Sequence, residues 1–160
     1  MVRRAKRSLR TYIDTSVFGG VYDEEFELAS RRFFHEVKAG RFVLLVSALT
    51  AVELMEAPES VRSFVERLPG RVLERVLVTE EALSLAREYL RAKILPSGAE
   101  ADATHVAIAA VARADLVVSW NFKHIVNLDR IRGFNAVNRV RGYPAVEIRS
   151  PREVIHEETV

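Results

Sequence analysis

The chain has 160 residues, of which 49% are hydrophobic, which suits one globular domain with a buried core. Its formal net charge is +2 and its isoelectric point is near 9.1, so a phosphate-bearing partner is compatible with its charge. The absence of cysteine excludes disulfide bonds, zinc–thiolate centres and thiol nucleophiles. Any metal ion must therefore be held by oxygen or imidazole ligands.

The apolar segments are short and interrupted. The basic residues 1–10 are followed by Asp14 and Gly19 and not by the apolar stretch of a signal peptide. The longest apolar run, residues 42–55, contains three polar residues and falls short of the ~20 residues that a membrane span needs. We therefore expect a cytoplasmic protein with no membrane contact.

Short β-rich runs alternate along the chain with amphipathic helical patterns. Strands are predicted at residues 11–13, 42–46, 72–78 and 116–118, and residues 146–148 are compatible with an edge strand. Helices are predicted at residues 25–39, 51–57, 60–68, 80–92 and 99–112, and the arginine-rich segment 120–140 is compatible with a short helix. This alternation predicts βαβ units around a parallel sheet. We expect one domain over residues 9–150, a basic extension at residues 1–8 and an acidic tail at residues 151–160. Within that tail, residues 153–158 are interpreted as a disordered end, with a contact surface as the alternative.

Four polar residues fall near the carboxyl ends of the predicted strands, where open parallel sheets bind ligands. Asp14 ends the first strand, Glu53 lies in the first turn of the helix after the second, Asp102 opens the helix before the fourth, and Asn121 follows that strand. Carboxylates brought together repel one another unless a cation neutralises them, and hard oxygen ligands suit Mg²⁺ or Mn²⁺. The sequence therefore predicts a divalent-metal site at Asp14, Glu53 and Asp102.

Three of these residues also have a purely structural interpretation. Asp14 could cap a following helix, and Asn121 suits a turn after a strand. Glu53 lies three residues after Thr50, in the pattern of a capping box. Its assignment to a metal site therefore depends on the other two acids.

Asp102 has a weaker structural interpretation, because Ser97 and Glu100 already offer a capping box at the same helix start. His105 lies three residues further on, on the same helical face, and could orient a ligand or bind phosphate. A surface or partly buried histidine is the more common role, so we do not assign His105 a catalytic one.

Three segments taken together resemble the PIN-domain family, most closely the VapC-type toxins of prokaryotic toxin–antitoxin pairs. They are residues 12–17 (Tyr-Ile-Asp-Thr-Ser-Val), the segment 47–54 that contains Glu53, and residues 101–103 in an alanine-rich helix. The likeness runs from about residue 9 to about residue 123. It implies a three-layer α/β/α fold with a central, mostly parallel sheet, and RNA cleavage with Mg²⁺ or Mn²⁺ held by acidic residues.

In this resemblance the first three family acids fall on Asp14, Glu53 and Asp102. Ser16 matches a hydroxyl that supports the first acid, and Ser119 matches the small hydroxyl residue that follows the fourth strand. The resemblance also implies a homodimer, and an antitoxin protein whose C-terminal segment covers the acidic site. An arginine of that segment entering the site would be the expected contact.

The chain departs from the family pattern at Asn121, at or near the position of a fourth acid. The lost carboxylate lowers the charge that can hold a second metal ion, so one metal fits the sequence better than two. Glu100 and Asp129 are acids that could replace it, although neither occupies the family position.

Basic residues after the fourth predicted strand could follow an RNA backbone, although most such charges are simply solvated. The candidates are Lys123, His124, Arg130, Arg132, Arg139 and Arg141.

These observations predict a metal-dependent endoribonuclease that hydrolyses RNA phosphodiester bonds. Asp14 and Asp102 would be direct metal ligands, and Glu53 would bind the metal through water or hold the attacking water as a base. One alternative is a PIN-like module that binds RNA or a partner and has lost cleavage, because of Asn121. Another is a HAD-like phosphohydrolase, which needs a second aspartate where this chain has Ser16.

Overall fold

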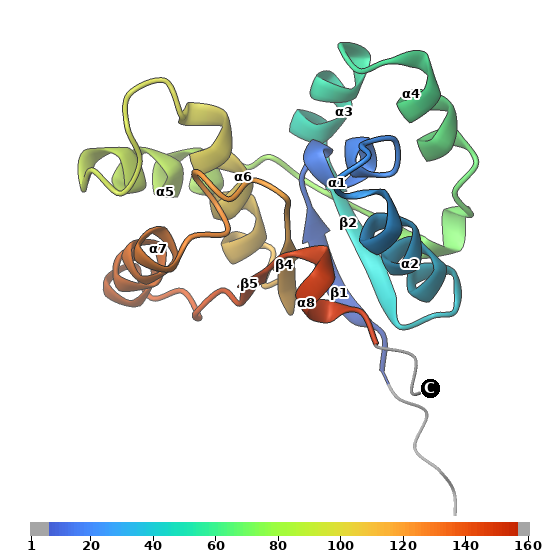
Figure 1. Ribbon diagram of the computed structural model, residues 1–160. Coiled ribbons are helices and arrows are strands. Elements are labelled where there is room, and N and C mark those ends of the chain that lie inside the picture. Colours follow the sequence, from blue (N-terminus) through green and yellow to red (C-terminus); the bar gives the residue numbers. More distant parts are fainter. Residues whose placement is uncertain (1–6, 157–160) are drawn as a thin grey trace, which may run out of the picture.

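The computed structural model describes residues 7–156, and within that range five parallel strands form a central sheet (Figure 1). In chain order they are β1 (Leu9–Ile13), β2 (Phe42–Ser47), β3 (Leu73–Val76), β4 (Leu116–Val118) and β5 (Ile148–Arg149). In space the order is β3-β2-β1-β4-β5. The chain therefore winds outward from β1 in one direction through β3, then crosses to β4 and winds in the other. This reversal between β1 and β4 marks where such sheets bind ligands.

Helices cover both faces of the sheet, which confirms the predicted α/β/α layers. Figure 1 shows α1, α2 and α4 on one side of the sheet and α5, α6 and α7 on the other. The helices are α1 (Thr15–Gly20), α2 (Glu27–Lys38), α3 (Ala48–Met55), α4 (Glu59–Glu66), α5 (Glu80–Arg91), α6 (Glu100–Val111), α7 (Leu128–Arg141) and α8 (Pro151–Val154). Across residues 7–156, every helix is too short or too polar to serve as a membrane-spanning segment.

The two faces of the sheet contribute to separate apolar cores. Tyr12 and Leu45 pack in the core that includes residues of α5, α6 and α7. Their neighbours Ile13 and Leu44 pack in the core that includes residues of α1, α2 and α4. Because successive side chains of a strand point to opposite faces, strands buried on both sides need apolar residues at every position. This requirement explains the continuous apolar run of β2.

Several helices differ from the sequence prediction. No helix is predicted between residues 13 and 25, but residues 15–20, which include Gly19 and Gly20, form α1. The arginine-rich segment suggests a short helix, but α7 has 14 residues. Its start is fixed by Asn127, whose side chain accepts a hydrogen bond from the backbone N–H of Arg130, and its end by Gly142 at φ +82°. Capping residues at both ends thus stabilise α7, although its weak apolar periodicity does not indicate a long helix.

The described part of the predicted acidic tail is ordered and joins the fold. The helix α8 packs against α2, and Pro151 at its first position is buried. The Glu153 carboxylate accepts a hydrogen bond from the backbone N–H of Ser150, which stabilises the start of α8. The expectation of a disordered end is therefore wrong for residues 153–156. Residues 157–160 and most of the predicted basic extension, residues 1–6, lie outside the described residues.

Candidate active site

A depression of about 520 Å³ lies at the carboxyl ends of β1 and β4, where the strand order reverses. Asp14 follows β1, Glu53 lies on α3 and Asp102 lies on α6, and all three side chains line this depression. The other lining residues are Ser16, Gly19, Gly20, Asp23, Phe26, Trp120 and Asn121. Three acids that lie far apart in the sequence are therefore brought to one concave surface.

Asp14 is the most buried of these acids, with 6% of its surface exposed. It occupies the position before α1 but makes no side-chain capping bond, so the capping interpretation is wrong. Its carboxylate instead accepts hydrogen bonds from Ser16 Oγ at 2.6 Å and Ser119 Oγ at 3.0 Å. Burial raises the pKa of Asp14, and these hydrogen bonds only partly oppose that effect. A nearby cation would favour the charged form of this carboxylate.

The two serines also join α1 to the segment that follows β4. Ser16 Oγ accepts a hydrogen bond from the backbone N–H of Trp120 at 3.0 Å. Ser119 Oγ accepts one from the backbone N–H of Asn121 at 2.9 Å. Each hydroxyl thus donates to Asp14 and accepts from the backbone after β4, which holds Asp14 in place.

Glu53 is held by a histidine and a threonine. Its Oε1 lies 2.5 Å from His105 Nε2, and its Oε2 accepts a hydrogen bond from Thr15 Oγ1 at 2.9 Å. Burial acts to raise the pKa of Glu53, but the hydrogen bonds from His105 and Thr15 and the favourable electrostatic interaction with His105 outweigh it, so the net shift is downward. Glu53 is therefore ionised at neutral pH.

The capping-box interpretation of Glu53 is wrong. The helix α3 begins three residues earlier than predicted, and its cap is Ser47, whose side chain accepts a hydrogen bond from the backbone N–H of Thr50. Glu53 lies in the sixth position of the helix, too far along to cap it.

His105 connects Glu53 to a buried chain of hydroxyl groups. Its Nδ1 lies 2.6 Å from the Tyr12 hydroxyl, which lies 2.9 Å from Ser47 Oγ. Burial raises the pKa of Tyr12 to about 12, so its hydroxyl keeps its proton. In the arrangement that satisfies every group, Ser47 donates to Tyr12, Tyr12 donates to Nδ1, and Nε2 donates to Glu53. We call this chain the Ser47–Tyr12–His105–Glu53 relay.

Asp102 is partly exposed, and its Oδ2 lies 2.7 Å from His124 Nδ1. The capping box predicted from Ser97 and Glu100 is absent, because α6 begins at Glu100 after Ala99 with no side-chain cap. Glu100 instead accepts a hydrogen bond from the backbone N–H of Gly98. Asp102 therefore makes no capping bond, as expected, but it has a partner that its local sequence does not reveal.

The donor chemistry of the depression fits a hard divalent cation. Asp14, Glu53 and Asp102 offer carboxylate oxygens, and within residues 7–156 the buried carboxylate of Asp14 accepts its side-chain hydrogen bonds from the neutral hydroxyl groups of two serines. Among residues 7–156, however, no three Asp, Glu or His side chains form a ready-made metal cluster. Glu53 and Asp102 are bonded to His105 and His124, so metal binding would require at least one of them to turn toward Asp14.

No protein-family model and no curated protein matches the sequence. Solved structures do match. VapBC2 of Rickettsia felis, bound to a DNA fragment from its promoter, is 13% identical, with a TM-score of 0.56 over 89% of this chain and 98% of that chain. DNA-bound VapBC of Salmonella typhimurium is 21% identical, with the same TM-score and coverage. VapC20 of Mycobacterium tuberculosis, a sarcin–ricin loop cleaving toxin, is 16% identical, with a TM-score of 0.51 over 86% and 98%.

The fold is VapC-like. These identities are low, so the likeness concerns the arrangement of strands and helices, and it confirms the fold that the sequence resemblance implied. The VapC-like fold of this chain places the predicted acids at the strand-order reversal.

The residue that departs from the family pattern, Asn121, has a structural role in this VapC-like fold. Its Oδ1 accepts a hydrogen bond from the backbone N–H of His124 at 2.9 Å, which stabilises the turn after β4. The interpretation of Asn121 as a turn residue is therefore confirmed. Asn121 also lines the depression, together with the three acids. Glu100 lines a different depression, and Asp129 lies in the first turn of α7, so neither replaces the missing acid.

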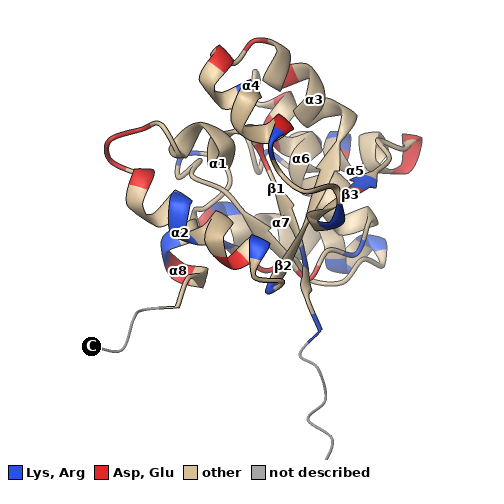
Figure 2. Ribbon diagram, turned by 90° about the vertical axis from the view of Figure 1, so that its right-hand side faces the viewer, with Lys and Arg blue, Asp and Glu red and all other residues tan. Residues whose placement is uncertain are grey.

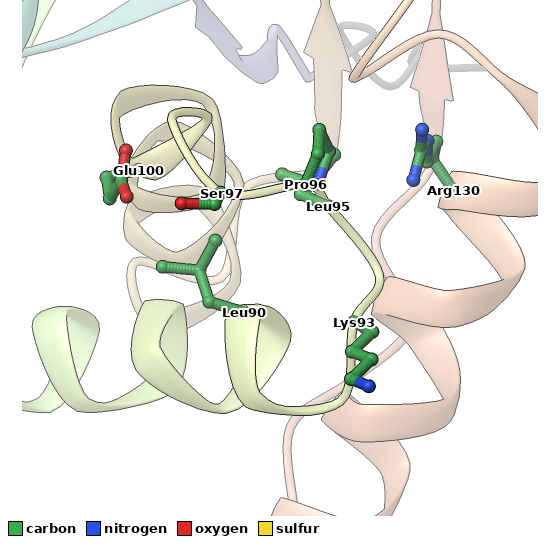
Figure 3. A pocket seen from close by; sticks show the side chains of 7 residues that line it. All are labelled: Leu90, Lys93, Leu95, Pro96, Ser97, Glu100 and Arg130. Carbon is green, nitrogen blue, oxygen red and sulfur yellow. The ribbon is translucent and has the colours of Figure 1, made fainter.

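The candidate RNA-binding residues are scattered. Lys123 is exposed, whereas His124 is turned inward to Asp102. Arg130 lines a separate depression of about 550 Å³ between α5, α6 and α7, where it donates a hydrogen bond to the carbonyl of Ile94. Figure 3 shows Arg130 and Glu100 on opposite sides of that depression. Arg132 is exposed on α7. Figure 2 shows that basic and acidic residues are interspersed along the helices and loops.

Sequence reasoning missed several residues of the depression. Asp23, in the acidic loop between α1 and α2 (Figure 2), lines it, but no strand end or motif marks that position. Phe26 and Trp120 line it as well, and each resembles an ordinary core residue in the sequence. The signal that could have been used is the pair Gly19 and Gly20, since adjacent glycines beside a candidate ligand often allow close approach.

Proposed function

We propose that this protein is a metal-dependent ribonuclease that hydrolyses RNA phosphodiester bonds, and that it is the toxin of a toxin–antitoxin pair. The observation that carries the proposal is the convergence of Asp14, Glu53 and Asp102 on one depression at the strand-order reversal. The VapC-like fold supports it, because one protein of that fold is described as a toxin that cleaves the sarcin–ricin loop.

In this proposal Asp14 and Asp102 hold Mg²⁺ or Mn²⁺. The ion, when bound, would offset the negative charge that gathers on the phosphate and favour attack by water. Ser16 and Ser119 keep the Asp14 carboxylate oriented toward the depression while it carries its charge.

Glu53 orients the attacking water in this proposal. Its carboxylate accepts from His105 and Thr15 and retains capacity for a further donor, since a carboxylate has about four acceptor positions. Its lowered pKa makes it a weak base. Glu53 is therefore better suited to hold a water by hydrogen bonding than to remove its proton completely.

A second candidate function is RNA or partner binding without cleavage. It is favoured by Asn121, whose side-chain oxygen is bonded to the backbone of His124 and supplies no fourth carboxylate. The HAD-like alternative lacks support, because Ser16 stands at the position of the required second acid and its hydroxyl is bonded to Asp14 and Trp120.

We also propose a homodimer, a small antitoxin protein as partner and a cytoplasmic location. Two of the structural neighbours are VapBC complexes, which supports a protein partner. The helix α3 is rich in apolar residues, yet Val52 and Met55 are mostly exposed, which is typical of a surface that contacts another protein.

The test is cleavage of a mixed RNA substrate by the purified protein with Mn²⁺. We expect Asp14→Asn and Asp102→Asn each to lower the cleavage rate at least about 100-fold, because each removes charge that stabilises the transition state. Excess EDTA should abolish cleavage by the parent. Asp129→Asn is the matched control, since Asp129 is an exposed acid on α7 outside the depression, and its rate should stay unchanged.

Three results would contradict the proposal. Equal cleavage by the parent and Asp14→Asn would show that the acids have no role in catalysis. RNA binding without cleavage by the parent would favour the second candidate function. Release of phosphate from small monoesters, with RNA left intact, would favour a phosphohydrolase.

A further inference from the structure

Three aromatic side chains, Phe26, Trp120 and Phe122, form a cluster at the edge of the acid-lined depression. The rings of Phe26 and Trp120 are stacked, with centroids 4.2 Å apart and an interplanar angle of 20°. The ring of Phe122 contacts both, at 6.3 Å from Phe26 and 6.0 Å from Trp120. Phe26 and Trp120 also line the depression, so the aromatic surface and the acids adjoin.

The inner part of this aromatic cluster is firmly anchored. Trp120 is only 5% exposed, and its indole N–H donates a hydrogen bond to Ser30 Oγ at 2.9 Å. Its backbone N–H donates to Ser16 Oγ, and Ser16 donates in turn to Asp14. The position of the aromatic cluster is therefore coupled to the position of the Asp14 carboxylate.

The outer part of the cluster is left open. Phe122 is 45% exposed, although its ring contacts the rings of Phe26 and Trp120. A half-exposed aromatic ring offers a face on which a flat ligand can stack. Gly19 borders the same depression, and a Cβ there would meet nothing within 4 Å, so the space next to Gly19 is open.

We propose that Phe122, supported by Phe26 and Trp120, is a stacking platform for an unpaired base of the RNA strand whose phosphodiester bond lies at the acids. This inference rests on the proposed ribonuclease function and specifies its substrate as single-stranded RNA. Aromatic side chains bind single strands by stacking on bases with little sequence preference. The bases of a duplex are stacked on one another and are not available to such a ring.

The charged residues near Phe122 favour one path for the RNA strand. Lys123 directly follows Phe122 and is exposed, so its ammonium group could bind the phosphate next to a stacked base. The loop between α1 and α2 carries Asp23, Glu24 and Glu25, all exposed, and it would repel the strand. The RNA backbone is therefore expected on the Lys123 side and not across that loop.

The experiment measures binding of a short single-stranded RNA that carries 2-aminopurine, in EDTA at low salt so that cleavage is prevented. We expect the parent to quench the 2-aminopurine fluorescence through stacking. Phe122→Ala should bind about 10-fold more weakly and lose the quenching, whereas Phe122→Tyr should keep both. Leu128→Ala is the matched control, because Leu128 is also an exposed apolar residue and should not affect binding. Thermal unfolding of each variant checks that it is folded.

Equal affinity and equal quenching for the parent and Phe122→Ala would overturn the platform. So would a duplex of the same sequence that binds with the same dependence on Phe122. Cleavage measured in parallel with Mn²⁺ separates this inference from the proposed function. If the parent cleaves RNA and Phe122→Ala binds as tightly, the platform alone is overturned. If the parent does not cleave but binds through Phe122, the platform is supported and the nuclease proposal is overturned.

Discussion

Tyr12 combines packing and positioning in one side chain. Its ring is fully buried in the core between the sheet and the helices α5 and α6, while its hydroxyl contacts His105 and Ser47. His105 is only 2% exposed, so it is too buried to bind a phosphate of RNA directly. We interpret His105 as a positioning residue that acts through Glu53. The relay explains why a histidine, with one nitrogen accepting and the other donating, suits this place.

The variant Tyr12→Phe tests this role. It removes the hydroxyl and leaves Nδ1 of His105 without its donor, so His105 can change tautomer or turn away from Glu53. We expect kcat for RNA cleavage to fall about 10- to 100-fold with little change in KM. The free energy of unfolding should fall by about 1–3 kcal/mol, since buried polar groups lose a partner.

Tyr89→Phe is the matched control for the relay. Tyr89 is equally buried, and its hydroxyl donates to the side-chain oxygen of Asn138, but it lies on α5 outside the acid-lined depression. This variant should lose similar stability and keep its kcat. If the two variants lose activity to the same degree, Tyr12 has only a structural role.

At the scale of elements, the short helix α1 decides how closely the segment after β4 can approach Asp14. Gly20 lies against that segment, and a Cβ there would come within 2.5 Å of Ser30 Oγ and 2.7 Å of Trp120 Nε1. Gly19, its neighbour in the same helix, has open space instead. The two glycines therefore have different reasons to be present: Gly20 allows packing, whereas Gly19 leaves the depression open.

Alanine at these two neighbouring positions should have opposite effects on stability. Gly19→Ala should raise the free energy of unfolding by about 0.5–1 kcal/mol, because alanine favours the helical backbone. Gly20→Ala should lower it by about 1–3 kcal/mol, because the buried Trp120 ring must shift. Denaturant unfolding followed by the fluorescence of the single tryptophan measures both, and stabilisation by Gly20→Ala would contradict the observed packing.

At the scale of the whole molecule, the site lies where the two halves of the sheet separate, so its acids come from segments that are distant in sequence. Asp14 directly follows the carboxyl end of β1 and is buried. Burying its charge opposes folding when no cation is present. The fold therefore keeps a destabilising group at the place where the proposed chemistry needs it, a common compromise at functional sites.

This cost predicts how stability depends on pH and metal. The pKa of Asp14 is higher in the folded protein than in the unfolded chain, so its ionisation weakens the fold as the pH rises above the unfolded value. In EDTA, Asp14→Asn should therefore be more stable than the parent by about 1 kcal/mol at pH 8. The gain should vanish toward pH 3, where the parent carboxyl is protonated in both states.

Adding Mn²⁺ should reverse the order of the two proteins. An ion at about 100 times its dissociation constant stabilises the parent by about 2.7 kcal/mol, whereas the variant should gain much less. Free energies of unfolding from denaturant titrations at several pH values, with and without Mn²⁺, measure both effects. Equal metal stabilisation of the parent and Asp14→Asn would exclude Asp14 as a ligand.

The strands, most of the helices and the gathering of three acids at the carboxyl ends of the strands could be predicted from the sequence. These features follow from local periodicity and from the rule that parallel strands end on the same side. Only the tertiary structure revealed the partners of those acids. Tyr12 and His105 are 93 positions apart, and Ser119 and Asp14 are 105 apart. No local pattern encodes such pairs, because they arise from the strand order and from how α1, α3 and α6 pack around the sheet. For the same reason, the cluster of Phe26, Trp120 and Phe122 forms only in the folded chain, because residue 26 lies far from residues 120 and 122 in the sequence.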